Sequence, residues 1–113
     1  MLAFLIAVVA QVQEPATTAS ARIPLITEIP WLVAPRVEYP ERALSNDVRW
    51  GEVVLDCTVG ESGRLTACVV VSERPSQQGF GAAVVRGVAS ATVDSKRAGE
   101  HIIFRASFSM RVE

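Results

Sequence analysis

Two adjacent β-rich runs restrict the fold of this chain more than any other feature of its sequence. Residues 51–59 and 64–73 are rich in valine and other strand-forming residues, and a short segment with a glycine at each end joins them. Successive side chains of a strand point to opposite faces. In the first run, this places on one face the side chains of Val53, Leu55, Cys57 and Val59. The pattern predicts an antiparallel hairpin with one face in the core.

The remainder of the chain predicts a helix and one further strand. Apolar side chains recur at helical spacing over residues 80–92, namely Phe80, Ala83, Val84, Val88 and Ala91. Gly87 within this helix costs about 1 kcal/mol relative to alanine, or allows a close approach to the sheet. Apolar and polar residues alternate over residues 102–112, as in a terminal strand. Together these elements predict a two-layer α+β domain, an antiparallel sheet of about three strands with helices packed on one face.

The segment before the hairpin contains no long regular element. Pro24, Pro30 and Pro35 interrupt it, remove backbone donors and exclude a continuous helix. We expect residues 23–35 to form an extended lead-in that packs on the domain. Residues 39–44 follow and predict a short helix, with Pro40 at a position that the first turn of a helix tolerates.

The two cysteines, Cys57 and Cys68, lie on the two arms of the predicted hairpin. In one register they are directly opposite each other and can meet disulfide geometry. In a register shifted by one, Val59 pairs with Leu65 and the cysteines lie on opposite faces; a bulge near Thr66 reconciles the two registers. A structural disulfide worth roughly 2 to 3 kcal/mol is the favoured interpretation. Two buried thiols and a metal pair are the alternatives, although the spacing is not Cys-x-x-Cys.

The first residues of the sequence indicate export. Residues 2–10 form an unbroken apolar run, and a polar, Thr-rich stretch follows. As a helix this run reaches about 14 Å, half of a ~30 Å hydrocarbon core, which favours a signal peptide over a membrane anchor. Small residues allow cleavage after Ala10 or after Ala21, although no basic residue precedes the apolar run. We expect residues 1–21 to be a Sec-type signal segment with a polar tail and residues 22–113 to be the folded domain; a buried N-terminal element is the alternative.

Charge and motif content exclude several functions. Eleven lysines and arginines stand against twelve aspartates and glutamates without a long run of like charges, so nucleic acid is not an expected partner. Cys57 and His101 could in principle form a thiol and imidazole pair, yet Cys57 lies within an apolar strand face and has a partner in Cys68. We therefore expect no catalysis, no metal site and no cofactor.

In order and spacing, these elements resemble the C-terminal domain of TonB, the periplasmic energy transducer of Gram-negative bacteria. The residues that carry the resemblance are Tyr39, Pro40 and Ala43, the run from Gly51 to Val59, Gly63, the helix start at Gly79, Phe80 and Gly81, and a last strand that ends in Phe108. No single motif is diagnostic, but their order and spacing are. The sequence is most similar to a cysteine-paired subgroup whose residues equivalent to Cys57 and Cys68 both face the core, which supports the bulged register.

The resemblance implies a periplasmic domain that binds a protein partner. Family members add a short extended peptide, from the periplasmic end of an outer-membrane receptor, to their sheet as a strand. In that mode, main-chain hydrogen bonds supply affinity and side-chain pockets supply selectivity. The pairing edge of the family corresponds here to Ile102, Ile103, Phe104, Arg105, Ser107 and Met110. Alternatively, this strand only completes the sheet, or pairs with a second copy in a small structural envelope protein that dimerises and has no transport role.

The sequence departs from that of a complete TonB. TonB resembles an anchored rod, with a membrane helix and a long Pro-rich spacer. Here the six prolines are scattered, and the segment before Tyr39 is too short to bridge the periplasm. We therefore expect a soluble adaptor, a competitor for the receptor peptide or a domain recruited to another envelope partner. Membrane association would require that the apolar N-terminal segment is retained.

Overall fold

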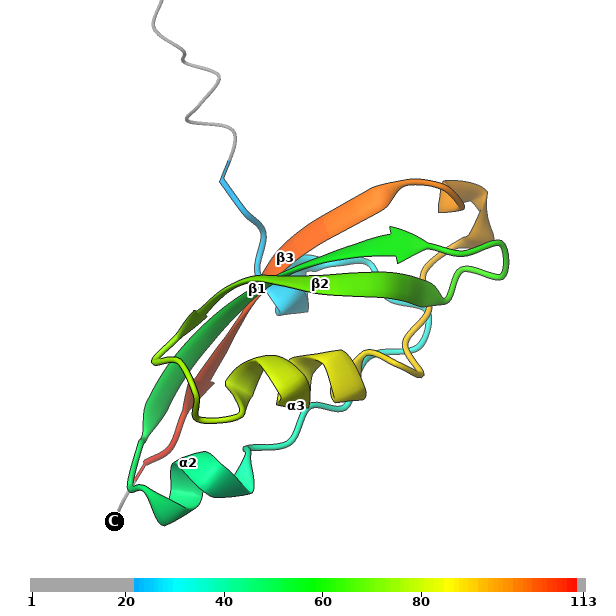
Figure 1. The fold of residues 1–113 in the computed structure, drawn as a ribbon. Helices are drawn as coiled ribbons and strands as arrows, with labels where there is room; N and C mark the ends of the chain where they lie inside the picture. The colour runs from blue at the N-terminus through cyan, green and yellow to red at the C-terminus, as the bar shows by residue number, and fades with distance from the viewer. Residues whose placement is uncertain (1–21, 112–113) are drawn as a thin grey trace, which may run out of the picture.

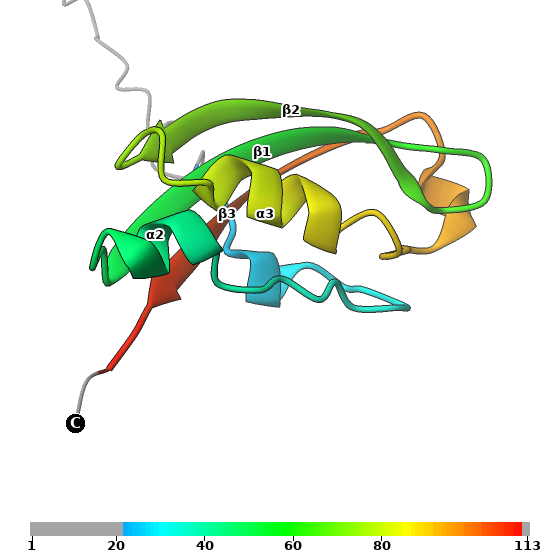
Figure 2. The same ribbon diagram turned by 60° about the horizontal axis from the view of Figure 1, so that its bottom comes forward.

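The structure of the protein is a computed structural model that describes residues 22–111. Three antiparallel strands form one sheet in the order β2-β1-β3, and the helices cover one face of it (Figures 1 and 2). The elements are η1 Ile26–Glu28, α2 Glu41–Ser45, β1 Trp50–Val59, β2 Leu65–Arg74, α3 Phe80–Gly87, η2 Ser95–Arg97 and β3 His101–Ser109. This architecture confirms the predicted two-layer α+β fold. The predicted signal segment, residues 1–21, lies outside the described residues.

The central strand, β1, pairs with both of its neighbours. Its register with β3 runs without interruption from Trp50 opposite Ser109 to the far end of β3. Its register with β2 is interrupted twice. One interruption is the predicted bulge, which lies at Ala67, one residue beyond the predicted position, where φ is 48°. The second leaves Val71 without a partner on β1 and had no signal in the sequence.

The core lies between the sheet and the helices. Burial alternates along β3, so that Ile102, Phe104, Ala106 and Phe108 are buried while the residues between them are at least partly exposed. Tyr39, Phe80 and Phe108 form an aromatic cluster with ring centroids 4.8 to 5.8 Å apart. The Tyr39 hydroxyl also donates a hydrogen bond to the Val48 carbonyl over 2.6 Å. The cluster therefore joins the entry to α2, the start of α3 and the end of β3.

The α3 helix ends at Gly87, although the sequence predicted a helix as far as residue 92. In the structure the lead-in comprises residues 22–38, and it causes this early end, because the Gly87 carbonyl accepts a hydrogen bond from the backbone N–H of Arg36 over 3.1 Å. A Cβ atom at residue 87 would lie 2.5 Å from the Arg36 carbonyl oxygen. The glycine thus permits a close approach to the lead-in rather than to the sheet. Val88 and Ala91 stay buried, as the apolar pattern requires. The terminal strand is also shorter than predicted and ends at Ser109.

The hairpin turn between β1 and β2 rests on the segment that follows α3. Gly63 has a φ of 87°, and its carbonyl accepts a hydrogen bond from the Val93 N–H over 2.9 Å. A Cβ atom at this position would lie 2.2 Å from the Val93 carbonyl oxygen. Both the backbone conformation and the close contact therefore require glycine.

Candidate functional site

The strand β3 forms one edge of the sheet, and its outward-facing backbone groups make up the candidate site. Within the described part of the chain, β1 is the only strand that neighbours it in the sheet. The backbone N–H of Arg105 points away from β1, because it donates to the Pro24 carbonyl of the lead-in over 2.9 Å. Backbone groups alternate between the two sides of a strand. The N–H groups of Ile103, Ser107 and Ser109 therefore also point outward.

The residues predicted for this edge occupy different positions along β3. Ile102 and Phe104 turn their side chains into the core, where both are buried. The backbone groups that point outward come from Ile103, Arg105 and Ser107. Met110 lies beyond the end of β3, and its N–H donates to the Arg49 carbonyl over 3.0 Å. Ser109 was missed, although its position two residues after Ser107 was enough to find it.

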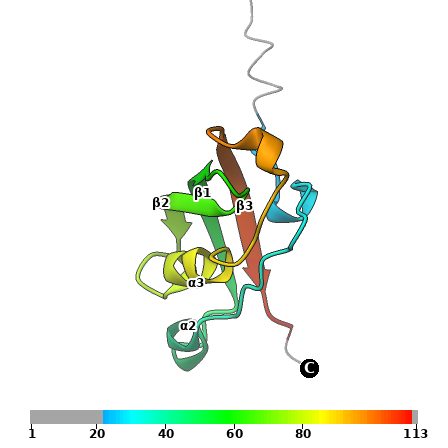
Figure 3. The ribbon, with the colours of Figure 1, turned by 90° about the vertical axis from the view of Figure 1, so that its right-hand side faces the viewer.

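The lead-in covers the middle of this edge. Leu25 forms an isolated parallel bridge with Arg105, and Figure 3 shows the lead-in beside β3. The carboxylate of Glu28 holds the lead-in in this shape, since it accepts the Leu25 N–H over 2.8 Å and pairs with Arg22 over 3.2 Å. The hydrogen bond from the Leu25 N–H is the main cause of a lowered pKa at Glu28, and the hydrogen bond from Arg22 adds to it. The edge is therefore open on either side of Arg105 but covered at Arg105 itself.

A groove lies between the lead-in and the C-terminal half of β3. Trp31 forms part of its wall; its indole N–H donates to the Ile26 carbonyl over 2.9 Å, and its ring meets that of Phe104 edge-on with centroids 5.8 Å apart. The groove has a volume of about 400 Å³, and its other lining residues include Ala34, Val37, Ser107 and Phe108. We call it the lead-in groove. It opens beside the part of the β3 edge that the lead-in leaves uncovered.

The sheet face opposite the helices carries a charged group that spans all three strands. Glu52 of β1 pairs with Arg74 of β2 over 2.7 Å and with Arg105 of β3 over 3.5 Å. The hydrogen bond from Arg74 is the main cause of a lowered pKa at Glu52, and the charge of Arg105 adds to it. The Glu52 side chain is only 18% exposed to solvent, whereas the Arg74 side chain is 69% exposed. Water therefore reaches this ion pair mainly from the side of the arginine.

This pair predicts a specific acid sensitivity. The pKa of Glu52 is lower in the folded protein than in the unfolded chain, so its contribution to stability is present above the unfolded pKa and is lost as the pH falls through the folded value. Between about pH 5 and pH 3, we expect the free energy of unfolding to fall less in Glu52→Gln than in the unmodified protein, by at most about 1 kcal/mol. Urea denaturation at several pH values measures this difference.

The control for this experiment is Glu61→Gln. Glu61 lies in the hairpin turn and takes part in none of the ion pairs found among residues 22–111. We expect this variant to keep the acid sensitivity of the unmodified protein. Equal sensitivity of Glu52→Gln and Glu61→Gln would contradict the role of Glu52.

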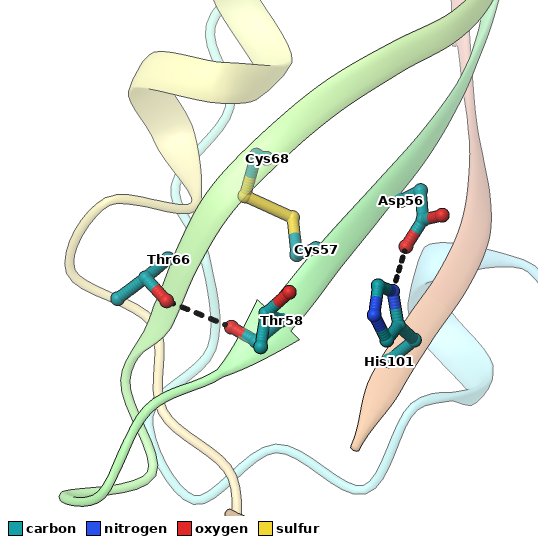
Figure 4. Close-up of a disulfide and its surroundings, with 6 residues drawn as sticks. All are labelled: Asp56, Cys57, Thr58, Thr66, Cys68 and His101. Atoms are coloured by element: carbon teal, nitrogen blue, oxygen red, sulfur yellow. Dashed lines mark hydrogen bonds and ion pairs between the residues drawn. A yellow bond between two sulfur atoms is a disulfide. The ribbon is translucent and has the colours of Figure 1, made fainter. Parts of the chain in front are cut away.

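A disulfide between Cys57 and Cys68 joins β1 to β2, as predicted (Figure 4). The Ala67 bulge turns Cys68 toward Cys57, which is fully buried on the core face. His101 lies on the other face of the sheet, where its Nδ1 atom is 2.9 Å from the Asp56 carboxylate. The two cysteines and the histidine therefore do not form a thiol and imidazole pair. Among residues 22–111, no group of three or more histidine, cysteine, aspartate or glutamate side chains could hold a metal ion.

The fold and its edge strand define an α+β domain of the TonB C-terminal type. The structure is similar to the solution NMR structure of the TonB C-terminal domain from Pseudomonas aeruginosa, with a TM-score of 0.50 and 22% sequence identity. The similarity covers 74% of this chain and 85% of that one. No family model matches the sequence, and no curated protein matches it. The similarity confirms the fold that the order of the sequence motifs predicted.

No helix within the described part of the chain is long and apolar enough to cross a membrane.

Proposed function

We propose that the protein is a TonB-like protein-binding module that takes up an extended peptide as an added strand at the β3 edge. The observation that carries this proposal is the outward-facing backbone of Ser107 and Ser109, which the lead-in leaves uncovered. An added strand gains its affinity from such groups, and neighbouring side-chain pockets supply selectivity. The lead-in groove lies in the right place to be such a pocket.

The irregular pairing of β2 favours β3 over the other edge of the sheet. Two interruptions in β2 disturb the spacing of its backbone groups, and such irregularities are a common means of discouraging pairing at an edge. Val69 and Val71 are exposed on β2, at 60% and 58%, so this strand would otherwise be open to association. Along β3, the register with β1 has no bulge, and the outward groups keep a regular spacing.

The partner that fits this proposal is the periplasmic peptide of an outer-membrane receptor. A periplasmic location agrees with the disulfide, which persists in oxidising compartments. In this proposal residues 1–21 serve as the export signal and residues 22–113 as the binding domain. In this proposal the module binds and does not catalyse; its cysteines are held in the disulfide and His101 is paired with Asp56, so they supply no thiol and imidazole pair.

Dimerisation through β3 is the second candidate function. The exposed side chain of Ile103 and the regular edge favour it, because two copies could pair their edge strands. The lead-in opposes it, since a second β3 strand of equal length would meet the lead-in at Arg105. A short peptide does not meet this obstacle.

Proline at residue 107 tests the proposal. Ser107→Pro removes one outward donor but leaves the inward donors of β3 to β1, and proline is tolerated at the outer side of an edge strand. We expect roughly tenfold weaker binding of synthetic peptides taken from the periplasmic N-termini of outer-membrane receptors, measured by isothermal titration calorimetry. Arg105→Pro is less suitable because it would also release the lead-in.

The matched control is Ser107→Thr, which keeps the backbone donor and suits a strand. We expect this variant to bind as the unmodified protein does. Equal binding by the proline and threonine variants would exclude strand addition at this position. If no receptor peptide binds and sedimentation shows a dimer that Ser107→Pro dissociates, the second candidate function is correct.

A further inference from the structure

We infer that the partner strand pairs only with residues 107–109 of β3 and places one apolar side chain in the lead-in groove. This inference rests on the proposed function and adds to it the length of the pairing and the chemistry of the partner. It has two independent supports, the contact of the lead-in with Arg105 and the lining of the groove.

The lead-in limits how far a partner strand can extend along β3. Pro24 already accepts the hydrogen bond of the Arg105 N–H, so the position beside Arg105 is occupied by the chain itself. The packing of Trp31 against Phe104 holds the lead-in against β3, and the ion pair between Arg22 and Glu28 holds the shape of the lead-in itself. A strand that enters from the C-terminal end of β3 therefore stops after it has paired with Ser109 and Ser107.

The lead-in groove receives the side chain that such a strand turns toward the core. Side chains of neighbouring strands share the same face at matching positions. Beside Ala106 and Phe108, which face the core, an added strand would direct a side chain into the groove. Among residues 22–111, no charged side chain lines this groove, and only Thr27 and Ser107 bring hydroxyl groups to it. An apolar side chain is therefore favoured, because a charged or amide group would lose water without gaining a partner.

The opposite face of the added strand meets a different environment. Its outward side chains would lie near Arg105, which pairs with Glu52 on the open face of the sheet. Polar side chains suit this face. The partner peptide that fits is therefore short, with one apolar residue flanked by polar residues.

The test compares two synthetic peptides that share a Thr-rich host sequence and carry leucine or asparagine at the central position. Each is titrated into the oxidised protein, and binding is followed by NMR. We expect the leucine peptide to bind roughly tenfold more tightly than the asparagine peptide, because burial of most of a leucine side chain is favourable by about the free energy that corresponds to this ratio. Shifts should appear at Ser107, Ser109 and Trp31, while the Arg105 amide should remain protected from hydrogen exchange.

A groove-filling variant and its control test whether the preference for the leucine peptide arises in the lead-in groove. Ala34→Phe fills the groove with a new ring, and Ala98→Phe makes the same change at an exposed position just before β3, at the end of the strand far from residues 107–109. We expect the ratio of the two affinities to approach one in Ala34→Phe and to stay near tenfold in Ala98→Phe.

The possible failures are distinct. Equal binding of the two peptides to the unmodified protein would overturn the inference, and so would loss of Arg105 protection when the leucine peptide binds. Both results leave the proposed function intact if receptor peptides still bind. If neither the receptor peptides nor the host peptides bind, the proposed function itself fails and the inference fails with it.

Discussion

Replacement of Phe104 by alanine is expected to lower the free energy of unfolding by about 3 to 5 kcal/mol. The Phe104 side chain is fully buried at the centre of β3, and its ring packs edge-on against Trp31 of the lead-in. The substitution leaves a cavity between the sheet and the lead-in, which the surrounding side chains fill only in part. Urea denaturation followed by circular dichroism measures the loss, and Trp31 fluorescence, read in a Trp50→Phe background, should report a more exposed indole.

The neighbouring residue on β3 provides the control for this prediction. Ile103 points to the opposite face and is 42% exposed, so Ile103→Ala should cost less than about 1 kcal/mol. If the two substitutions had equal effects, the assignment of the inward and outward faces of β3 would be wrong. The outward-facing backbone groups of the candidate edge would then belong to the neighbouring residues of β3.

Reduction of the disulfide is expected to lower the free energy of unfolding by about 2 to 3 kcal/mol. The bond closes a loop with a sequence separation of 11, which restricts the unfolded chain. It also holds the bulged part of β2 against β1, where the ladder between the strands is interrupted. Denaturation with and without a thiol reductant measures the difference.

A double variant separates the bond from other effects of the reductant. Cys57→Ala combined with Cys68→Ala should be less stable than the oxidised protein and insensitive to reductant. In the unmodified protein, thiol titration under denaturing conditions should detect no free thiol before reduction. Detection of free thiols at both positions would show that the bond does not form and would remove the support that it gives to a periplasmic location.

The sheet could be predicted because its signal is local. An alternation of apolar and polar side chains, broken by Val54 in β1 and by Ile103 in β3, identified these two strands, and glycines at residues 60 and 63 marked the turn of the hairpin. The end of α3 could not be predicted in this way. The apolar spacing continues past Gly87, and the helix stops because a distant segment, at Arg36, crosses close to it. Such a contact between segments far apart in sequence leaves no local pattern.

The candidate site was only partly predictable for the same reason. The alternation along the terminal strand identified it as a strand with one buried face, and the resemblance indicated its edge as the place of pairing. The bridge between Leu25 and Arg105 had no signal, because prolines break the periodicity of the lead-in and the bridge depends on a single backbone hydrogen bond. The second interruption of β2, at Val71, was missed as well, since the valine run fits either register.

The uninterrupted register of β3 with β1 has a mechanical consequence. When tension acts along a strand, its hydrogen bonds are loaded in shear and resist together, whereas tension across a strand unzips them one at a time. Because no bulge interrupts the pairing of β3 with β1, a strand paired beside β3 would lie along a continuously hydrogen-bonded support. Even a short pairing at residues 107–109 would then withstand a pull directed along β3 far better than a pull directed away from the sheet. The direction from which a tethered partner pulls would therefore decide how long the complex survives.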